Sequence, residues 1–241
     1  MKEGKNRRKI AFRAVVVGGV LISAAAVALY TPWLGLFDLR AIRVSGNHHV
    51  SAAQVGQAAG LSRGRPLLAI SCSAVSERIS QIPWVREVRV SRAFPHTLHI
   101  EVTERISVAV MSLPDGRCVM LGDGGVVVAE GCQESATELE LVGAELTQSE
   151  TGGKLVEPTV VELIDAVRGP LDLETNIRRI DVSDLSSVIL EAESGLRILL
   201  GAIDSHAQRL ARLSVLGREI DLSAYRTIDL RLEGEATLVT W

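Results

Sequence analysis

Residues 82–105, IPWVREVRVSRAFPHTLHIEVTER, decide the fold of the first globular part of this protein. Along Thr97–Thr103, the apolar residues Leu98, Ile100 and Val102 alternate with polar ones. This period of two is typical of an antiparallel strand with one buried face. The run Trp84–Ser91 predicts a second strand just upstream.

Another strand and two short helices are predicted before this pair of strands. Leu39–Ser45 alternates loosely and predicts the first strand. Ser51-Ala52-Ala53-Gln54 is a capping box that opens a helix, which Gly60 ends. A second helix runs from about Ser71 to Ile82 and ends before Pro83. The sequence therefore predicts the order β-α-α-β-β in fewer than 70 residues.

Composition excludes several classes of protein. The chain has 241 residues, with 26 Lys and Arg against 29 Asp and Glu, so its net charge is −3. This balance excludes a nucleic-acid binder of the usual basic kind. Aromatic residues are only 3% of the chain, which argues against stacking platforms for bases or sugars. Hydrophobic residues make up 47%, enough for a buried core, so global disorder is excluded.

The N-terminal segment predicts a membrane anchor. Residues 1–13 hold six basic residues and one acidic residue, and no charge occurs between Arg13 and Asp38. The 24 residues between them would form a helix of about 36 Å, against about 30 Å of hydrocarbon. We expect a span over Ala14–Thr31 with the basic tail in the cytoplasm, so that about 200 residues are exported. The alternative is a cleavable signal peptide with a cleavage site near residues 24–28.

A second exported domain is predicted over residues 106–241. The patterns predict a mostly antiparallel sheet and two helices, one starting at Pro158 and one opened by a capping box at Ser205–Gln208. The predicted strands are Ser107–Ser112, Arg117–Leu121, Val126–Ala129, Ile177–Ser183, Ser187–Glu193, Leu196–Gly201, Thr227–Leu232 and Glu235–Trp241. The overall fold class is α+β.

The three cysteines indicate no metal site. Cys118 and Cys132 flank a predicted hairpin, and they are either a disulfide or two separate small core residues. A disulfide there would contribute about 3 kcal/mol. Cys72 is expected to be a buried helix residue.

No set of catalytic residues stands out. Gly60-Leu61-Ser62-Arg63-Gly64 matches G-x-S-x-G, but a nucleophile elbow needs a strand before it and a helix after it. A connector between the two helices is the favoured interpretation. The histidines have no chelating arrangement and are expected at the surface; they are His48, His49, His96, His99 and His206. We therefore expect no catalytic residue, no cofactor and no metal.

Three segments carry a resemblance to a known family. Leu39–Asn47, Ile82–Arg92 and Phe94–Arg105 resemble the three strands of a POTRA domain. A single POTRA domain after one transmembrane helix resembles the FtsQ/DivIB family of bitopic cell-division proteins. Leu139–Gly143 and Tyr225–Arg231 resemble the β domain of that family. The family usually has a proline two residues after the Glu-Arg pair of residues 104–105, where this chain has Ser107.

The resemblance implies a domain organisation and a localisation. The expected parts are a cytoplasmic tail (1–13), a transmembrane helix with its outer flank (14–37), a POTRA domain (38–105) and an FtsQ-type β domain (106–241). The protein is then expected in the cell membrane at the division septum, with its C-terminal bulk outside the cytoplasm.

The resemblance also implies a function and a binding site. It implies a non-enzymatic divisome scaffold that recruits FtsB-like and FtsL-like proteins and helps regulate septal peptidoglycan synthesis. Its POTRA domain would serve localisation and contacts with other divisome membrane proteins. The partner site falls on the C-terminal strand region, with these residues: Leu232, Glu235, Ala236, Thr237, Leu238, Val239, Thr240 and Trp241.

The terminal strand supports this site independently of the resemblance. A last strand is often an edge strand, which can accept a strand from a partner. Thr237, Val239 and Trp241 would share one face of it. Trp241 is either an interface anchor or packs on its own sheet, and the sequence leaves both open. The alternatives to a division scaffold are a POTRA-type polypeptide transport or assembly factor and an anchored hydrolase that would depend on Ser62.

Overall fold

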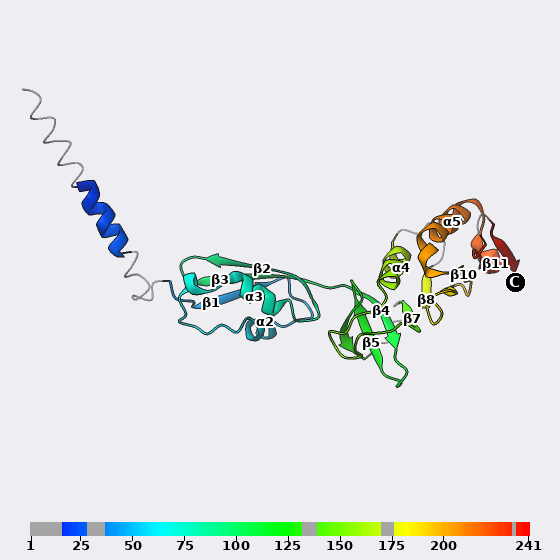
Figure 1. Ribbon diagram of the computed structural model, residues 1–241, viewed down its shortest axis with the longest axis horizontal. Helices are drawn as coiled ribbons and strands as arrows, with labels where there is room; N and C mark the ends of the chain where they lie inside the picture. Colours follow the sequence, from blue (N-terminus) through cyan, green and yellow to red (C-terminus); the bar gives the residue numbers. More distant parts are fainter. Residues whose placement is uncertain (1–15, 28–36, 132–138, 170–175, 233–234) are drawn as a thin grey trace, which may run out of the picture. The chain divides into compact units, whose positions relative to one another are not determined.

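The computed structural model describes residues 16–27, 37–131, 139–169, 176–232 and 235–241. Contacts divide the chain into two compact units (Figure 1). The first contains the residues up to Gln81 together with Val85–Glu104. The second contains Ile82–Trp84 and Arg105–Trp241.

The first unit has a three-stranded sheet and two helices, as the sequence predicts. Its elements are β1 (Ala41–Ser45), α2 (Ala52–Ala59), the 3-10 turn η2 (Leu67–Ala69), α3 (Cys72–Ile79), β2 (Val85–Ala93) and β3 (Thr97–Glu104). The strand order is β1-β3-β2, with β1 parallel and β2 antiparallel to β3. The predicted order β-α-α-β-β is confirmed.

The alternation in β3 creates the core of this unit. Leu98, Ile100 and Val102 are at most 2% exposed and form the core face of the central strand. The helices bury Val55, Ala59, Val75 and Ile79. The predicted capping box is present, because the Ser51 side chain accepts a hydrogen bond from Gln54 and the Gln54 side chain accepts one from Ser51.

The second unit has a nine-stranded sheet with the order β12-β11-β10-β9-β8-β7-β4-β5-β6. Its strands are β4 (Ser107–Ser112), β5 (Cys118–Gly122), β6 (Val126–Glu130), β7 (Glu140–Val142), β8 (Ile177–Asp181), β9 (Val188–Ala192), β10 (Arg197–Gly201), β11 (Tyr225–Asp229) and β12 (Thr237–Thr240). Its helices are α4 (Pro158–Arg168), α5 (His206–Glu219) and the 3-10 turns η3 (Ile203–Ser205) and η4 (Leu222–Ala224). Pairing is parallel for β4/β7, β7/β8 and β10/β11 and antiparallel for the other five pairs, so the mostly antiparallel prediction is confirmed.

Helices α4 and α5 lie on one side of this sheet (Figure 1). Leu163 and Ile164 of α4 and Leu213 of α5 are at most 1% exposed and join one core with the sheet. On the sheet, Ile180 and Ile228 belong to the same core and are fully buried. The alternate residues of the strands remain half-buried or exposed on the other face.

Three local predictions in the second unit are wrong. β11 ends at Asp229 rather than Leu232, because the Asp229 carboxylate accepts the backbone N–H of Arg231 and turns the chain. Ser205 makes no side-chain cap at α5, because the 3-10 turn η3 leads directly into the helix. His206 is 7% exposed rather than at the surface, and its Nδ1 lies 2.7 Å from the carbonyl oxygen of Ile203.

The cysteines are described only in part. Cys118 forms a disulfide. Cys72 is a helix residue, as expected, but as the first residue of α3 it is a half-buried free thiol rather than a buried one. Cys132, which the sequence offers as a partner for Cys118, lies outside the described residues.

A helix of residues 16–27 lies inside the predicted membrane span. The predicted cytoplasmic tail and both ends of the span fall outside the described residues. Across the parts of the chain that are described, no helix has the length and apolar character needed to cross a membrane.

Candidate functional site

Strand β12 lies at one end of the nine-stranded sheet. It pairs antiparallel with β11, so that Val239 lies opposite Thr227 and Leu238 opposite Ile228. Among the described strands, none pairs with its other side. An edge strand of this kind presents a row of backbone N–H and C=O groups that a further strand can bind.

The two faces of β12 differ in burial. Ala236 and Leu238 are partly buried and pack against the core of the second unit. Thr237, Val239 and Trp241 are exposed, with exposed fractions of 49% for Val239 and 69% for Trp241. Ala236 and Leu238 therefore hold the strand on its own sheet while the other face is exposed, as the alternation in the sequence predicts, and Thr240 at the end of the strand is exposed as well.

Trp241 lies against its own sheet and is also exposed. A Cβ atom placed on Gly195 would lie 3.3 Å from Cη2 of Trp241, so the indole lies against the turn between β9 and β10. The side chain nevertheless keeps 69% of its surface exposed. The packing of Trp241 on its own sheet, which the sequence offers as one alternative, is therefore present, and the role of an interface anchor stays a prediction.

The exposed face of β12 continues a row of charged residues across the sheet. The row passes through Glu140, Arg179, Glu191, Arg197, Thr227 and Val239 on successive strands. Ion pairs join Arg179 to Glu140 at 3.8 Å and Arg197 to Glu191 at 3.4 Å. These charged residues line a polar groove of about 410 Å³, which also includes Gly195. The open face thus changes from alternating charge to threonine and valine at the edge.

Helix α5 holds the loop that leads into β12. The guanidinium of Arg212 donates hydrogen bonds to the backbone carbonyl oxygens of Leu232, at 3.1 Å, and Glu235. Arg209, on the same helix, donates to the carbonyl oxygen of Leu200 at 2.6 Å, next to the end of β10. No local signal in the sequence indicates these arginines, because their roles depend on the packing of α5 beside the sheet edge.

The eight predicted site residues lie in one short segment but not in one strand. Thr237–Thr240 form β12, while Glu235 and Ala236 precede the strand and Trp241 follows it. Leu232 lies in the loop after β11 and is 61% exposed. The exposed apolar groups of the segment are therefore Leu232, Val239 and Trp241.

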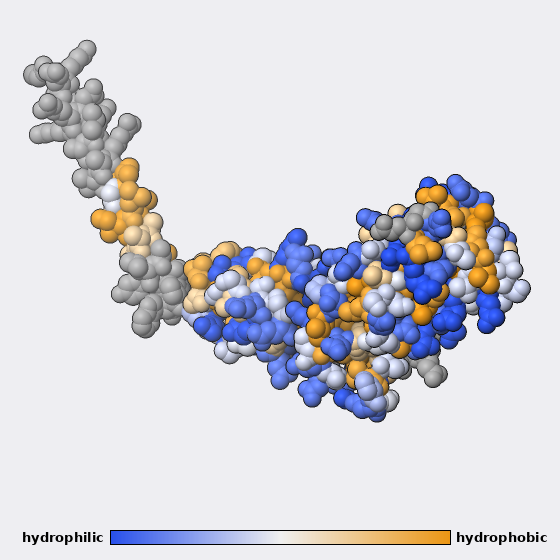
Figure 2. Space-filling model, turned by 45° about the vertical axis from the view of Figure 1, so that its right-hand side comes forward, coloured by the Kyte–Doolittle hydropathy of each residue, from blue (hydrophilic) through white to orange (hydrophobic). Residues whose placement is uncertain are grey.

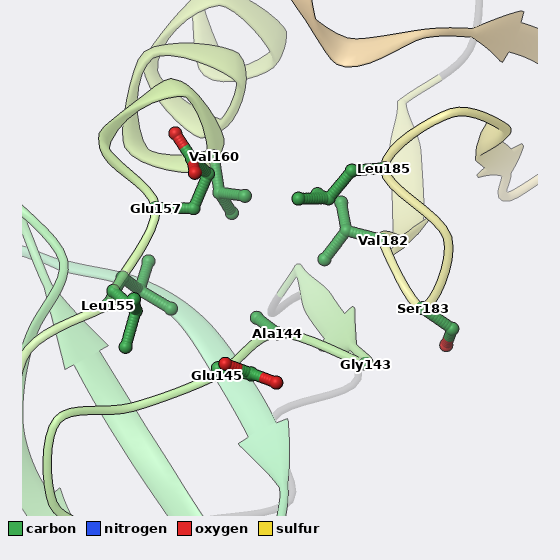
Figure 3. Close-up of a pocket in the computed structure, with 10 residues that line it drawn as sticks. Gly143, Ala144, Glu145, Leu155, Glu157, Val160, Val182, Ser183 and Leu185 are labelled. Carbon is green, nitrogen blue, oxygen red and sulfur yellow. The ribbon is translucent and has the colours of Figure 1, made fainter.

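A second hollow of about 190 Å³ lies elsewhere in the second unit (Figure 3). Val160, Val182 and Leu185 point toward one another across it, and Ser183 points away. The carboxylate of Glu157 at its rim caps α4 by accepting the backbone N–H of Thr159 at 3.5 Å, and it also accepts a hydrogen bond from the Thr159 hydroxyl at 2.9 Å. The lining mixes apolar side chains with Glu145, Glu157 and Ser183, and among these described residues no nucleophile is paired with a base.

The G-x-S-x-G segment does not have the geometry of a nucleophile elbow. Gly60 ends helix α2 in the left-handed conformation, with φ of 61°, so no strand leads into Ser62. The segment connects α2 to the turn η2, so the interpretation as a connector is confirmed. Over the described residues, no group of three or more His, Cys, Asp or Glu side chains could hold a metal ion.

Comparison with known proteins gives consistent matches along the chain. Residues 37–105 match the family model described as the FtsQ-type POTRA domain. A cell division protein FtsQ from a Geobacter species is 30% identical over 81% of this chain and 73% of its own length. The one from Corynebacterium glutamicum is 27% identical over 86% of this chain and 90% of its own length. The one from Mycolicibacterium smegmatis is 28% identical over 84% of this chain, which spans 59% of that relative.

Proposed function

This chain belongs to the FtsQ family of cell-division proteins, and from that premise we propose that it is a membrane-anchored scaffold of the division septum. It acts by binding rather than by catalysis. Its second unit binds FtsB-like and FtsL-like division proteins through β12, and the assembly helps regulate septal peptidoglycan synthesis. The POTRA unit contacts other divisome membrane proteins.

The observation that supports this proposal is the unequal burial of the two sides of β12. Leu238 packs on the core, while Val239 and Trp241 remain exposed at an edge that has no further strand among those described. A partner strand added to this edge would form backbone hydrogen bonds, which give affinity. The exposed side chains would give specificity.

Membrane attachment belongs to the same proposal. The uncharged stretch between Arg13 and Asp38 would cross the bilayer once, with the basic residues 1–13 on the cytoplasmic side. The helix of residues 16–27 lies within that stretch. The two units then lie outside the cytoplasm, which suits the disulfide at Cys118 because disulfides persist in oxidising compartments.

The test compares lysine substitutions at the edge with a matched control. Val239→Lys and Trp241→Lys place a charge at the proposed interface, and Val156→Lys places one at a distant valine of similar exposure, 52% against 49% for Val239. The full chain is reconstituted in nanodiscs, and binding of the FtsB-like partner is measured by calorimetry.

Each edge variant should lose at least about 2 kcal/mol of binding energy, because hot-spot residues contribute that much. The control should bind normally, and all three thermal midpoints should stay close to the parent value. Unchanged binding in both edge variants would contradict the proposed site. In cells, a fluorescent fusion should form a band at mid-cell, and depletion of the protein should produce filaments; an even membrane signal with normal division would contradict the division role.

A further inference from the structure

One end of the first unit exposes apolar side chains. Leu68 is 61% exposed and Phe94 is 57% exposed. The ring of Phe94 meets that of Phe37 edge to face, with a centroid distance of 6.0 Å. Figure 2 shows hydrophobic atoms on the surface of this unit. Leu68 and Phe94 are therefore exposed large apolar groups, and Phe37 beside them is half-buried.

Backbone hydrogen bonds bring three separate segments together at this end. The backbone amide of Leu67 donates a hydrogen bond to the carbonyl oxygen of Phe37 at 2.8 Å. The backbone amide of Leu39 donates one to the carbonyl oxygen of Arg65 at 2.9 Å. The amide of Arg40 donates to the carbonyl oxygen of His96 at 2.9 Å. We call residues 37–40, 63–68 and 93–96 the proximal loops.

The proximal loops are positively charged. Arg40, Arg63 and Arg65 are exposed, and Asp38 is the one acidic residue in these three segments. No ion pair joins these arginines to an acidic residue among those described, so their charges are available to an external anion. Exposed apolar groups surrounded by arginines are typical of surfaces that bind lipid, where the rings enter the interface and the guanidinium groups reach phosphates.

Chain length keeps this surface close to the bilayer. Phe37 is six residues after Thr31, where the proposed anchor ends. Six extended residues reach at most about 22 Å, so the proximal loops cannot move far from the membrane. This tether raises the effective concentration of lipid at the loops far above that of a diffusing protein partner.

We propose that the proximal loops dock on the anionic phospholipid surface of the membrane. Leu68 and Phe94 enter the interfacial layer, and Arg40, Arg63 and Arg65 bind lipid phosphates. This inference rests on the proposed anchor but is independent of the partner site on β12. It would hold the POTRA unit against the bilayer.

The test places a spin label at Leu68 in the full chain. A Cys72→Ser background removes the free thiol, and Leu68→Cys then accepts a nitroxide. The matched control is His48→Cys in the same unit. β1 starts beside the proximal loops and runs about 13 Å to Ser45, so His48 lies at the opposite end. The protein is reconstituted in vesicles of phosphatidylglycerol with phosphatidylcholine or of phosphatidylcholine alone, and label accessibility to oxygen and to a water-soluble nickel complex is measured.

In the anionic vesicles, the label at Leu68 should be severalfold less accessible to the nickel complex than the label at His48. The protection should weaken in pure phosphatidylcholine and at high salt, where the charges are screened. Replacing Arg40, Arg63 and Arg65 with glutamine should lower the ratio of docked to free unit by about fivefold for each arginine.

Equal accessibility of the two labels in anionic vesicles would overturn the docking proposal. The proposal would also be overturned if the label at Leu68 is protected to the same extent in both lipid compositions and in the arginine variants. Alkaline extraction distinguishes this failure from that of the anchor: protein that stays in the vesicle membrane retains the anchor proposal, and protein that is released overturns both.

Discussion

The guanidinium of Arg212, in helix α5, donates a hydrogen bond to the carbonyl oxygen of Leu232 at 3.1 Å. A second nitrogen of the same group binds the carbonyl oxygen of Glu235. One side chain therefore binds two carbonyl oxygens within the connection between β11 and β12. The edge strand is positioned by the helix layer as well as by its pairing with β11.

Replacing Arg212 should weaken partner binding although the residue does not lie on β12. Arg212→Gln removes the two charge-assisted bonds to the loop, which contribute about 1–2 kcal/mol together at this exposed position. We expect faster amide hydrogen exchange in β12 and about a fivefold loss of partner affinity. Arg212→Lys keeps the positive charge but lacks the planar guanidinium that binds both carbonyl oxygens, so its partner affinity should lie between those of the parent and Arg212→Gln. Unchanged exchange in β12 would contradict a positioning role.

Glu104 should make the first unit less stable in acid. Burial raises the pKa of this carboxyl, but hydrogen bonds from the backbone amides of His49, Val50 and His48 outweigh it and hold the pKa at about 2. A carboxyl with a lowered pKa stabilises the fold above its unfolded value near 4.5, and this contribution disappears as the pH falls towards 2. The contribution is about 3 kcal/mol. Glu104→Gln should lower the free energy of unfolding at pH 7 by a similar amount and should flatten its pH dependence between 4.5 and 2, as measured by urea denaturation. Glu101→Gln, on the exposed side of the same strand, is the control and should change little.

Replacing Gly195 with a residue that has a side chain should lower both the stability of the second unit and its partner affinity. Its φ of +87° disfavours other residues, and a Cβ would lie 3.3 Å from the indole of Trp241. Gly195→Ala should lower the free energy of unfolding by about 1 kcal/mol for the backbone and should also displace the indole, reducing partner affinity. Gly116→Ala is the matched control, because Gly116 has φ of +82° with no atom near its Cβ position. Similar stability loss in both variants, with normal binding in both, would show that Trp241 does not depend on Gly195.

Reduction of the disulfide at Cys118 should destabilise the second unit without abolishing partner binding. If the bond closes the segment to Cys132, reduction should cost about 3 kcal/mol of stability. Cys118 lies on β5, which several strands separate from β12 in the sheet. Mass spectrometry of the unreduced protein identifies the partner cysteine, and thermal melts with and without reductant give the cost. Equal melting temperatures would show that the bond contributes no stability.

Local patterns predicted the elements of the first unit well. Alternation in Thr97–Glu104 and the Ser51–Gln54 capping box each specify one element through neighbours two to four residues away. The same reasoning failed at Ser205, where a preceding 3-10 turn replaces the cap. It also failed at His206, because burial depends on segments that pack from elsewhere in the chain.

The candidate site was predictable only as a segment. The alternation of Thr237, Val239 and Trp241 indicated a shared face, and the structure confirms it. That β12 lies at a sheet edge follows from the order of nine strands, in which β4 pairs with β7, a strand that does not follow it directly in the sequence. The contact of Trp241 with the Gly195 turn joins residues 46 positions apart, so no local signal could reveal it.

By itself, the sequence determined the family, the order of elements in the first unit, the faces of β12 and the candidate partner residues. These features depend on side-chain periodicity, capping and turn chemistry, which act over a few residues. Only the tertiary structure decided which strand is exposed at the edge, which arginine holds the loop before it, and which loops gather at one end of the first unit. Those features depend on contacts between distant segments, and such contacts form only when the sheets and helices bury their apolar faces together.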